Sequence, residues 1–497
     1  MVSEQLEREL KYNAAADYVL PPLDGLDTST DADSGRVGVE SVRLESVYFD
    51  TADHDLLARN ITLRCRTGDA DNGWQLKVPT GDARTEIRLG PTAGHTTVPK
   101  ELAVLVAGTR RGKALRHTVT VRTDRTVHRV TTTAGEVVVE VADDHVDAVA
   151  PGRSEATLSS WREIEAELGP AGTQDTLTVI GERLAQAGAT ASTSPNKVSK
   201  ALGMTPGADQ LPATTGRRTT AGDVIRTYLA AQDDALIDGD LALRRGLGGI
   251  HPTRVATRRL RSSLRIFAAY FDRERAEGFD ADLAWYAALL GEVRDREVQR
   301  ARFSKMISEL PPEQVLGPVV ARIEEHLLAE QVQHQKMLDK AMNSRRYLAL
   351  LRESNRWVTD PPFTDLAEQK PAALRRQVRS AAKKVRKHLA AGLAPTGTDE
   401  ELHKARKAGK RARYAAELAH PVLGKKTKNA VNQYKELQDI LGDLQDGFVA
   451  ADILRRIAAG TAQHANENGF TYGLLYAQEQ TRAQHSRQQA VAWVDKL

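Results

Sequence analysis

Hydrophobic and polar positions follow different periods in the two halves of this 497-residue chain. Up to about residue 180, segments such as 61–66, 74–78 and 136–141 alternate in polarity or are rich in β-branched residues, and glycine and aspartate turns separate them. A period of two is typical of β-strands that bury one face. Helical patterns interrupt the strands at 100–107 and 175–187. This half therefore predicts an antiparallel sheet or closed barrel with peripheral helices.

The second half of the chain has a helical pattern almost throughout. It follows a segment rich in proline, glycine, threonine and alanine that begins at Met204. We therefore expect an α+β protein with two domains: a sheet domain over residues 1–203 and an all-α domain over residues 217–497. A linker over residues 204–216 would join them.

The helical half contains an internal repeat. The segment HPTRVATRRLR, which begins at His251, aligns with HKARKAGKRAR, which begins 152 residues later at His403. LGEVRD from Leu290 aligns with LGDLQD from Leu441 at nearly the same offset. Two motifs that recur together indicate a duplicated four-helix bundle. We expect its copies over about residues 217–357 and 370–497.

The composition is that of a folded protein, with 41% hydrophobic and 27% charged residues. The one cysteine, Cys65, excludes a disulfide framework and a cysteine-based zinc cluster. The start lacks a signal peptide and no run of 18 apolar residues occurs, so we expect a cytoplasmic protein without a membrane partner. Residues 1–205 hold 23 basic and 30 acidic residues, a net charge of −7, and the remainder holds 47 and 36, a net charge of +11. This asymmetry favours a basic half that binds a polyanion.

Basic residues of the helical half recur at the spacing of one helix face. They form one stripe in each copy of the repeat and a third stripe between the copies: His251, Arg254, Arg258, Arg261 and Arg265; His403, Arg406, Lys410 and Arg413; Arg375 and Arg379. A solvated helix face is the usual explanation of such a stripe. The duplication with histidine in register favours an anion site instead. With only 5% aromatic residues, base stacking is disfavoured, so we expect a continuous phosphate polymer rather than nucleic acid.

Charged residues of the sheet half follow the strand period. The sets that would share a strand face are Glu7, Glu9 and Lys11; Arg64 and Arg66; Arg84, Glu86 and Arg88; Glu163, Glu165 and Glu167. Such faces ordinarily point to water. If they point into a barrel, the interior holds acids for a hard divalent cation and bases for phosphate oxygens. The clustered acids favour this interpretation because they would repel one another unless cations neutralised them.

The helical half resembles the CHAD family, on HPTRVATRRLRSSLRIF with LLGEVRDREVQ and on LHKARKAGKRARYAAEL with LQDILGDLQD. The resemblance covers roughly residues 217–497. It implies two four-helix bundles that bind inorganic polyphosphate in a basic central cavity, and with it an association with polyphosphate granules. The residues implicated are His251, Arg254, Arg258, Arg261, His403, Arg406, Lys410 and Arg413. Gln445 replaces Arg294 in the second copy, so the charge at that position is not symmetric.

The sheet half resembles the CYTH family, also called triphosphate tunnel metalloenzymes. The resemblance rests on E-x-E-x-K from Glu7, YFDTAD from Tyr48, LRCR at 63–66, WQLK at 74–77, RTEIRL at 84–89 and REIEAEL at 162–168. It implies an eight-stranded antiparallel tunnel that hydrolyses or cyclises triphosphates with Mg²⁺ or Mn²⁺. It implies catalytic roles for Glu7, Glu9 and Lys11, metal ligands at Glu7, Glu9, Glu163 and Glu165, and phosphate contacts from Arg64, Arg66, Lys77, Arg84, Arg122, Arg125 and Lys197.

These observations lead to one principal functional hypothesis and two alternatives. We expect an inorganic triphosphatase that hydrolyses triphosphate or short polyphosphate in the tunnel, while the helical domain binds polyphosphate. One alternative is a non-catalytic polyphosphate-binding protein. The other is an enzyme of the thiamine-triphosphatase or adenylate-cyclase type. The sequence does not indicate an oligomeric state, a preferred metal or a preferred chain length.

Overall fold

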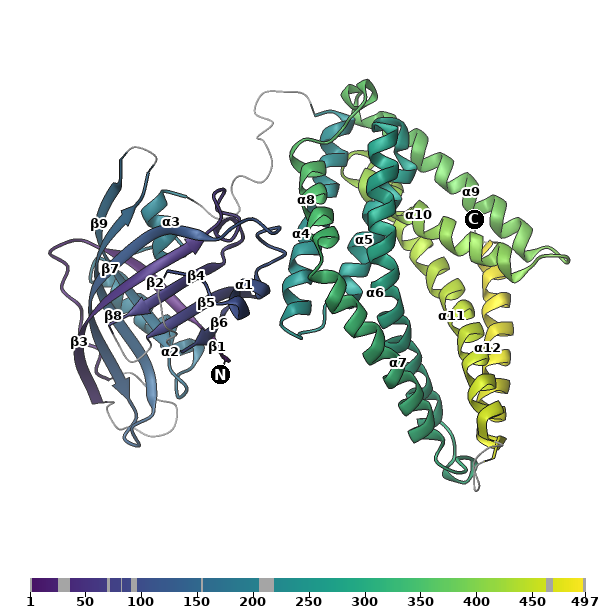
Figure 1. Ribbon diagram of the computed structural model, residues 1–497, viewed down its shortest axis with the longest axis horizontal. Coiled ribbons are helices and arrows are strands. Elements are labelled where there is room, and N and C mark those ends of the chain that lie inside the picture. The colour runs from purple at the N-terminus through teal and green to yellow at the C-terminus, as the bar shows by residue number, and fades with distance from the viewer. Residues whose placement is uncertain are drawn as a thin grey trace. The chain divides into compact units, whose positions relative to one another are not determined.

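The chain folds into two compact units, Met1–Pro212 and Ala213–Leu497. The computed structural model describes residues 2–25, 36–68, 72–81, 83–90, 96–152, 155–204, 219–461 and 468–494. The expected linker over residues 204–216 lies outside these residues except for Met204. Figure 1 shows a unit of strands and a unit of helices, as the sequence pattern predicts.

The first unit is built on one antiparallel sheet with the strand order β1-β6-β5-β4-β3-β7-β8-β9-β2-β10. The strands are β1 (Val2–Glu7), β2 (Glu9–Ala14), β3 (Arg36–Asp50), β4 (Thr62–Thr67), β5 (Gly73–Thr80), β6 (Ala83–Leu89), β7 (Arg116–Thr131), β8 (Val137–Ala150), β9 (Thr157–Leu168) and β10 (Thr190–Ala191). The sheet curls strongly (Figure 1).

The two sides of the curled sheet meet at the N-terminal segment. Only Arg8 separates β1 from β2, yet β1 pairs with β6 and β2 pairs with β9. The amide of Leu168 donates a hydrogen bond to the carbonyl of Arg8 at 2.9 Å. The ladder itself is not closed, because its order ends at β1 and at the two-residue strand β10. The predicted eight strands correspond to the observed ten when β1 and β2 count as one strand and β10 is left out.

Alternation along β9 sends apolar side chains outward beneath a helix. Ile164 and Ala166 of β9 pack against Leu177, Ile180 and Leu184 of α2 (Gln174–Gln186). Their neighbours Glu163, Glu165 and Glu167 therefore point to the other face of the sheet. Two short helices, α1 (Lys100–Leu105) and α3 (Lys197–Leu202), complete the described helices of this unit. The helical cover lets the inner face be polar without exposing an apolar outer face.

The second unit is all-α in the part of the chain that the structure describes. Its helices are α4 (Ala221–Arg244), α5 (Ile250–Ile266), α6 (Arg273–Ser308), α7 (Val319–Met342), α8 (Arg345–Thr359), α9 (Arg375–Leu393), α10 (Asp399–Leu423), α11 (Lys425–Thr461) and α12 (Phe470–Val494). No described helix has the length and apolar character that a bilayer span requires. The repeat relates α4–α7 to α9–α12: α6 and α11 have 36 and 37 residues, and α7 and α12 have 24 and 25.

The duplication extends to side-chain contacts. Arg254 of α5 pairs with Asp295 of α6 at 3.1 Å, and Arg406 of α10 pairs with Asp446 of α11 at 3.6 Å. Each guanidinium also lies over a glycine of the facing helix, Gly291 in the first copy and Gly442 in the second. The two copies share one core, in which Leu260 of α5 and Leu437 of α11 belong to the same apolar cluster. The predicted fold class is thus confirmed, with the copies fused rather than separate.

Candidate functional site

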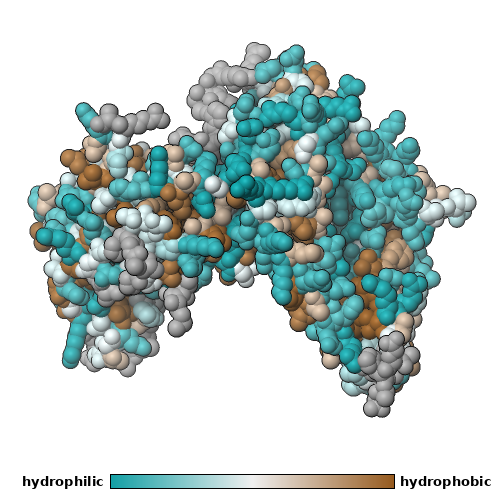
Figure 2. Space-filling model, viewed as in Figure 1, coloured by the Kyte–Doolittle hydropathy of each residue, from teal (hydrophilic) through white to brown (hydrophobic). Residues whose placement is uncertain are grey.

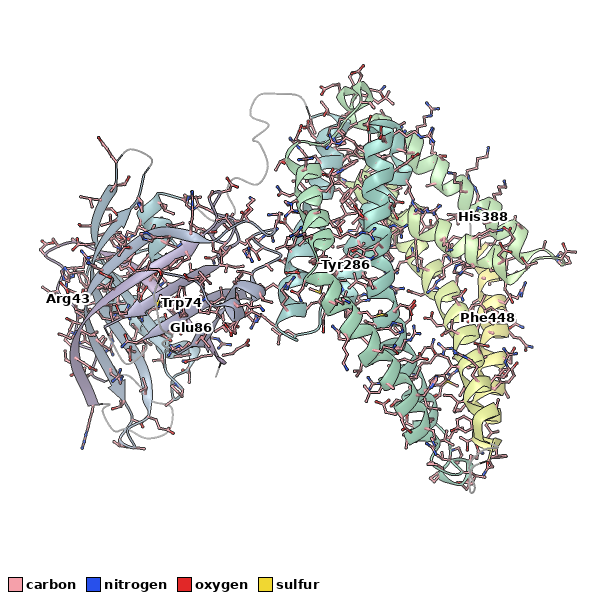
Figure 3. All side chains as sticks on the ribbon, viewed as in Figure 1. Arg43, Trp74, Glu86, Tyr286, His388 and Phe448 are labelled. Atoms are coloured by element: carbon pink, nitrogen blue, oxygen red, sulfur yellow. The ribbon has the colours of Figure 1, made fainter. Side chains whose placement is uncertain are left out.

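The inner face of the sheet encloses a cavity of about 430 Å³, which we call the tunnel cavity. Every strand from β1 to β9 contributes a charged side chain to its lining, and α3 adds Lys197. Among the described lining residues, nine are basic and seven are acidic: Lys11, Arg64, Arg66, Lys77, Arg84, Arg88, Arg125, Arg129 and Lys197; Glu7, Glu9, Glu40, Glu86, Glu140, Glu165 and Glu167. Figure 3 shows Glu86 within the sheet unit, whereas Arg43 lies at its outer edge. The space is therefore a site for charged groups of both signs.

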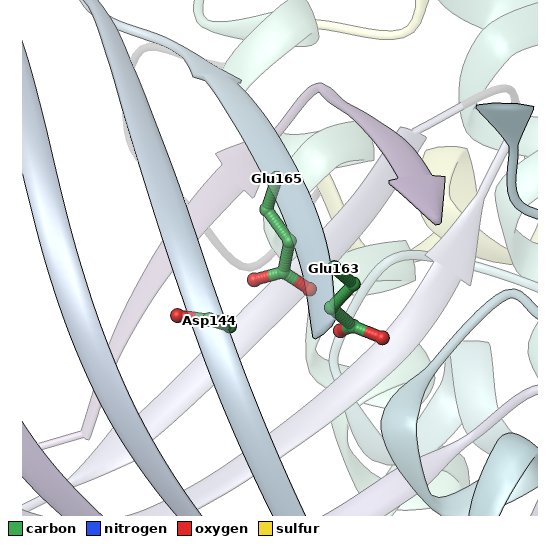
Figure 4. Close-up of side chains that lie close together, drawn as sticks. All are labelled: Asp144, Glu163 and Glu165. Atoms are coloured by element: carbon green, nitrogen blue, oxygen red, sulfur yellow. The ribbon is translucent and has the colours of Figure 1, made fainter. Parts of the chain in front are cut away.

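Three carboxylates of β8 and β9 gather at one side of the tunnel cavity. Asp144, Glu163 and Glu165 place one oxygen each within 4.8 Å of one another, and Figure 4 shows them converging from the two neighbouring strands. The ammonium of Lys197 contacts all three, at 2.9, 2.6 and 2.8 Å respectively. Arg125 adds a bidentate pair to Asp144 at 2.7 and 2.6 Å. This acidic cluster is therefore a place where positive charge is strongly favoured.

The N-terminal motif connects this acidic cluster to the opposite side of the cavity. Lys11 pairs with Glu9 at 3.1 Å and also binds Glu165. Glu7 accepts a hydrogen bond from Lys77 at 2.6 Å, and the same ammonium lies 3.7 Å from Glu86. The lysines thus link carboxylates of different strands.

On the side of the tunnel cavity opposite the acidic cluster, neutral groups as well as charged groups hold Arg64. Its Nε donates to Gln75 at 2.7 Å and its Nη1 donates to the phenol oxygen of Tyr48 at 3.1 Å. Among the described residues, the carboxylate of Glu86 lies 4.0 Å from this guanidinium. Because no close ion pair engages all of its donors, this guanidinium can bind a phosphate oxygen without first losing a strong carboxylate contact.

Burial and neighbouring charges compete in setting the pKa values of the tunnel acids. Burial alone would raise the pKa of Glu165, but Lys11, Lys197 and Arg125 outweigh it and hold the pKa well below its ordinary value. The same competition, with Lys77, Arg64 and Arg88 as the cations, lowers the pKa of Glu86 to about 2. Burial raises the pKa of Glu167 to about 7, with Glu7 as a further cause. Most of the acid set therefore keeps its charge at neutral pH.

The carboxylates fit a hard divalent cation by their chemistry. Oxygen ligands in this number are what Mg²⁺ and Mn²⁺ prefer, and the acidic cluster brings three together from adjacent strands. A metal there would take over the role of the Lys197 ammonium, which now neutralises the same oxygens.

Most of the residues predicted for the sheet domain lie together. Those that line the tunnel cavity are Glu7, Glu9, Lys11, Arg64, Arg66, Lys77, Arg84, Arg125, Glu165 and Lys197. Glu163 lies beside them, buried against Lys197. Arg122 is an exception: its side chain is 68% exposed and pairs with Glu45 at 2.8 Å. Because it lies an odd number of residues from Arg125, it points to the opposite face of β7.

Sequence reasoning missed several residues of the tunnel. Asp144 was not predicted, although it pairs in register with Arg125 of β7 and with Glu163 of β9. Tyr48 lay within a quoted motif, but its contact with Arg64 depends on the pairing of β3 with β4. Arg129 and Glu140, which form an ion pair at 2.9 Å, also line the cavity. The pairing register of neighbouring strands, rather than the composition of any one strand, places these residues at the tunnel cavity.

A second cavity of about 630 Å³, which we call the central cavity, lies in the helical unit between α5, α6, α10 and α11. The predicted residues in its lining are His251, Arg254, Arg258, Arg261, Arg265, His403, Arg406 and Lys410. Arg294, Lys407 and Arg411 add further positive charge, whereas Asp295 and Asp446 are the acidic residues among the described lining. Figure 2 shows that the face of the helical unit turned to the viewer is mostly hydrophilic.

Positive charge in the central cavity is incompletely compensated. The Nε atoms of Arg258 and Arg406 are buried and have no hydrogen-bond partner among the described residues. Burial, together with the neighbouring like charges of Arg406, Arg258 and Arg254, lowers the pKa of Lys410 to about 7. His403 shares a hydrogen bond of 2.8 Å with Gln445. An anion that entered this space would relieve both the repulsion and the unpaired donors.

Three residues predicted for the polyanion site lie elsewhere. Arg413 does not line the central cavity and instead pairs with Glu417 at 3.0 Å. Arg375 and Arg379 lie on the exposed face of α9 and line no described cavity. Basic residues occur on more than one face of α9, so their spacing alone could not tell which face meets the interior.

Comparisons with known proteins agree with the division of the chain into a sheet unit and a helical unit. The CYTH domain model matches residues 19–201, and the CHAD domain model matches residues 227–455. The uncharacterised Mycobacterium tuberculosis proteins MT2285 and Rv2226 are each 33% identical over 518 residues, which cover 100% of this chain and 97% of theirs. A solved CHAD domain from the plant Ricinus communis has 22% identity and a TM-score of 0.45, covering 58% of this chain and 96% of its own. PptA from Streptomyces chartreusis has 20% identity and a TM-score of 0.46, covering 55% and 99%.

The fold and the two cavities define a protein in which a charged sheet tunnel precedes a duplicated basic helical unit. The chain belongs to the family of proteins that carry a CYTH domain followed by a CHAD domain.

The lowered pKa of Lys410 makes the stability of the helical unit depend on pH. Below about pH 7 the folded protein carries the full cost of this ammonium. The unfolded chain keeps its proton up to its ordinary pKa of 10.5, so the cost disappears as pH rises between these values. We predict that Lys410→Met is more stable than the wild type at pH 6, and that the difference shrinks steadily toward pH 9. Thermal unfolding followed by helical circular dichroism measures it.

The matched control is Lys387→Met, which removes an exposed ammonium from α9. It should change the unfolding temperature little and by the same amount at each pH. A Lys410→Met difference that stays constant or grows with pH would contradict the proposed crowding of charge.

Proposed function

We propose that the sheet unit is an inorganic triphosphatase: it hydrolyses inorganic triphosphate or short polyphosphate with Mg²⁺ or Mn²⁺. The observation that carries this proposal is the tunnel cavity, in which carboxylates and cations from all around the curled sheet face one enclosed space. Membership of the CYTH family, whose members depend on metals and include triphosphatases and cyclases, supports it. Because its proposed substrates are inorganic phosphate chains, we propose that the protein is cytoplasmic and associates with polyphosphate granules.

The basic residues of the tunnel would bind the phosphate chain. Arg64 and Arg84 on one side, and Arg125 on the other, offer guanidinium groups that suit paired phosphate oxygens. Lys11 and Lys197 are now bound to carboxylates, and they would turn to phosphate when those carboxylates bind metal. Each charged group would keep a partner of opposite charge throughout this exchange. A buried ion without such a partner would cost several kcal/mol.

The carboxylates would provide the metal site. Glu7, Glu9, Glu163 and Glu165 are the residues that would hold the cation, with Asp144 beside them. A divalent cation bound there supplies charge neutralisation at the phosphate oxygens and a lower pKa for bound water. The cations of the chain would hold the substrate in line and stabilise the charge that develops on the leaving phosphate.

The lining favours an inorganic substrate over a nucleotide or thiamine derivative. Among the described lining residues of the tunnel cavity, Tyr48 carries the one aromatic ring, and its phenol is engaged by Arg64. The remaining lining is dominated by charge, which suits phosphate and offers little to an organic ring system. A specific observation favours one alternative, a tunnel that binds without turnover: the Lys197 ammonium already satisfies the acidic cluster.

We predict that the protein releases orthophosphate from inorganic triphosphate only when Mg²⁺ or Mn²⁺ is present. Glu7→Gln/Glu9→Gln should lower kcat/KM on the order of a hundredfold, because the metal loses charged ligands while the side-chain shape is kept. Arg122→Ala, which removes a cation from the outer face of the same sheet, is the matched control and should retain activity. The measurement is the initial rate of orthophosphate release.

A substrate panel separates the alternatives. ATP and thiamine triphosphate should give a lower kcat/KM than inorganic triphosphate. A higher value for either organic substrate would reject the inorganic assignment. Binding of triphosphate without release of phosphate, with either metal, would reject the enzyme and favour the binding protein.

We propose further that the central cavity binds inorganic polyphosphate. Two buried guanidinium donors without partners, the crowding around Lys410 and the CHAD assignment support this role. A phosphate polymer presents closely spaced charges without bases, and the described lining of the cavity likewise offers many cations and few aromatic groups.

We predict that Arg258→Ala/Arg406→Ala weakens polyphosphate binding by about tenfold or more, because hydrogen bonds to charged groups contribute about 1.5–3 kcal/mol each. The double variant should also flatten the dependence of affinity on salt, since fewer counterions are released. Arg375→Ala/Arg379→Ala removes the same charge from the exposed face of α9 and should change affinity less than about threefold. Equal losses in the two double variants would reject the central cavity as the binding site.

A further inference from the structure

The helical unit contains a third cavity, about 760 Å³ in volume, which we call the side cavity. It lies between the C-terminal end of α5, the 3-10 segments Ala268–Tyr270 and Asp365–Glu368, and helices α9 and α10. Its size is that of a small-molecule site. We propose that the side cavity binds a nucleoside polyphosphate.

The charges of the side cavity suit a phosphate chain. Its described lining contains basic residues from three helices and no aspartate or glutamate: Arg265, Arg376, Lys384, His388, Lys404, Lys407 and Arg411. Lys404 and His388 are paired with Glu401, and Arg265 with Asp280. Arg376 and Lys384 form no ion pair within the part of the chain that the structure describes. His388 projects from α9 in Figure 3.

The rest of the lining suits an organic group rather than more phosphate. Ile266, Ala269, Tyr270 and Leu366 give the cavity an apolar part, against which phosphate oxygens would lose hydration without gaining a partner. A nucleoside supplies a ring for this surface.

A single amide favours a ligand that carries a hydrogen-bond donor in addition to its phosphates. The Oε1 atom of Gln377, which lines the side cavity, is buried and has no hydrogen-bond partner among the described residues. This oxygen needs a donor. Ionised phosphate oxygens are acceptors, so inorganic polyphosphate would leave it unsatisfied. The amino group of a base or a ribose hydroxyl would satisfy it.

The side cavity and the central cavity share part of their lining. Arg265, Lys407 and Arg411 belong to both. Burial lowers the pKa of Arg411, and the nearby Arg265 and Arg261 lower it further. A nucleotide in the side cavity would neutralise charge that polyphosphate in the central cavity also uses. Nucleotide and polyphosphate should therefore weaken each other's binding reciprocally, a consequence that rests on the proposed polyphosphate site, whereas nucleotide binding itself does not.

Photolabelling of the full-length protein with 8-azidoadenosine triphosphate tests the proposal. A chelator prevents hydrolysis. Inorganic triphosphate, which weakens nucleotide binding only through the residues shared with the central cavity, should displace the label less completely than ATP does. Labelled peptides are expected from residues 265–273 and 369–388, and excess ATP should abolish this labelling. Label confined to the sheet unit, or displacement by excess inorganic triphosphate as complete as that by ATP, would overturn the proposal. These arms use the unmodified protein, so they do not depend on the folding of a variant.

A matched pair of variants on α9 locates the site. Arg376→Ala/Lys384→Ala should weaken ATP binding by about tenfold or more, because both cations line the side cavity. Arg375→Ala/Arg379→Ala removes the same charge from the exposed face and should change it less than about threefold. Equal effects of the two pairs would overturn the assignment. Loss of nucleotide labelling with intact polyphosphate binding, or the reverse, tells the two proposed sites apart.

Discussion

Mutual neutralisation of buried charges is the constraint on which the sheet unit depends. Asp144, Glu163 and Glu165 have side chains that are 0–13% exposed, and each reaches the ammonium of Lys197 within 3 Å. An isolated buried ion costs several kcal/mol, so neither the acids nor the bases could occupy the interior alone. The curled sheet resolves this by placing carboxylates and cations on facing strands, and the helices outside make the polar interior possible by covering the apolar outer face. The same arrangement makes the interior able to bind a cation and an anion together.

In the helical unit, by contrast, positive charge is only partly compensated. Its central cavity gathers cations from both copies of the repeat, with only partial compensation by Asp295 and Asp446. The result is repulsion within the folded protein, which adds to burial in lowering the pKa of Lys410. A tunnel in which charge is balanced suits chemistry on a short chain with a metal, whereas a cavity with excess positive charge suits retention of a long anion. In the proposed function, the two units would combine turnover and capture of one class of compound.

The extent to which the sequence predicts this structure depends on how regular each pattern is. Between Glu163 and Leu168 of β9, polarity alternates at every residue, so the shared face of Glu163, Glu165 and Glu167 follows directly from the period. In β8, Asp143 and Asp144 are adjacent, so alternation cannot tell which one faces inward, and only the register with β7 and β9 decides it. The internal repeat likewise predicts the duplicated helical unit, because two histidine motifs at one offset imply symmetric placement, whereas the central cavity was expected from the resemblance to the CHAD family. The repeat could not predict which face of α9 lines a cavity, because basic residues occupy opposite faces of this helix and packing determines which of them meets a cavity.

The central claim is that the acids and bases of the tunnel exchange partners to hold a metal and a phosphate chain. A crystal structure of the full-length protein with Mn²⁺ and a non-hydrolysable triphosphate analogue tests it most directly, because anomalous scattering locates the metal. We expect Mn²⁺ on carboxylates of β9 and the N-terminal motif, with the ammonium groups of Lys11 and Lys197 turned from Glu165 to the analogue. An analogue bound outside the tunnel, or carboxylates still paired with both lysines and without Mn²⁺, would contradict it.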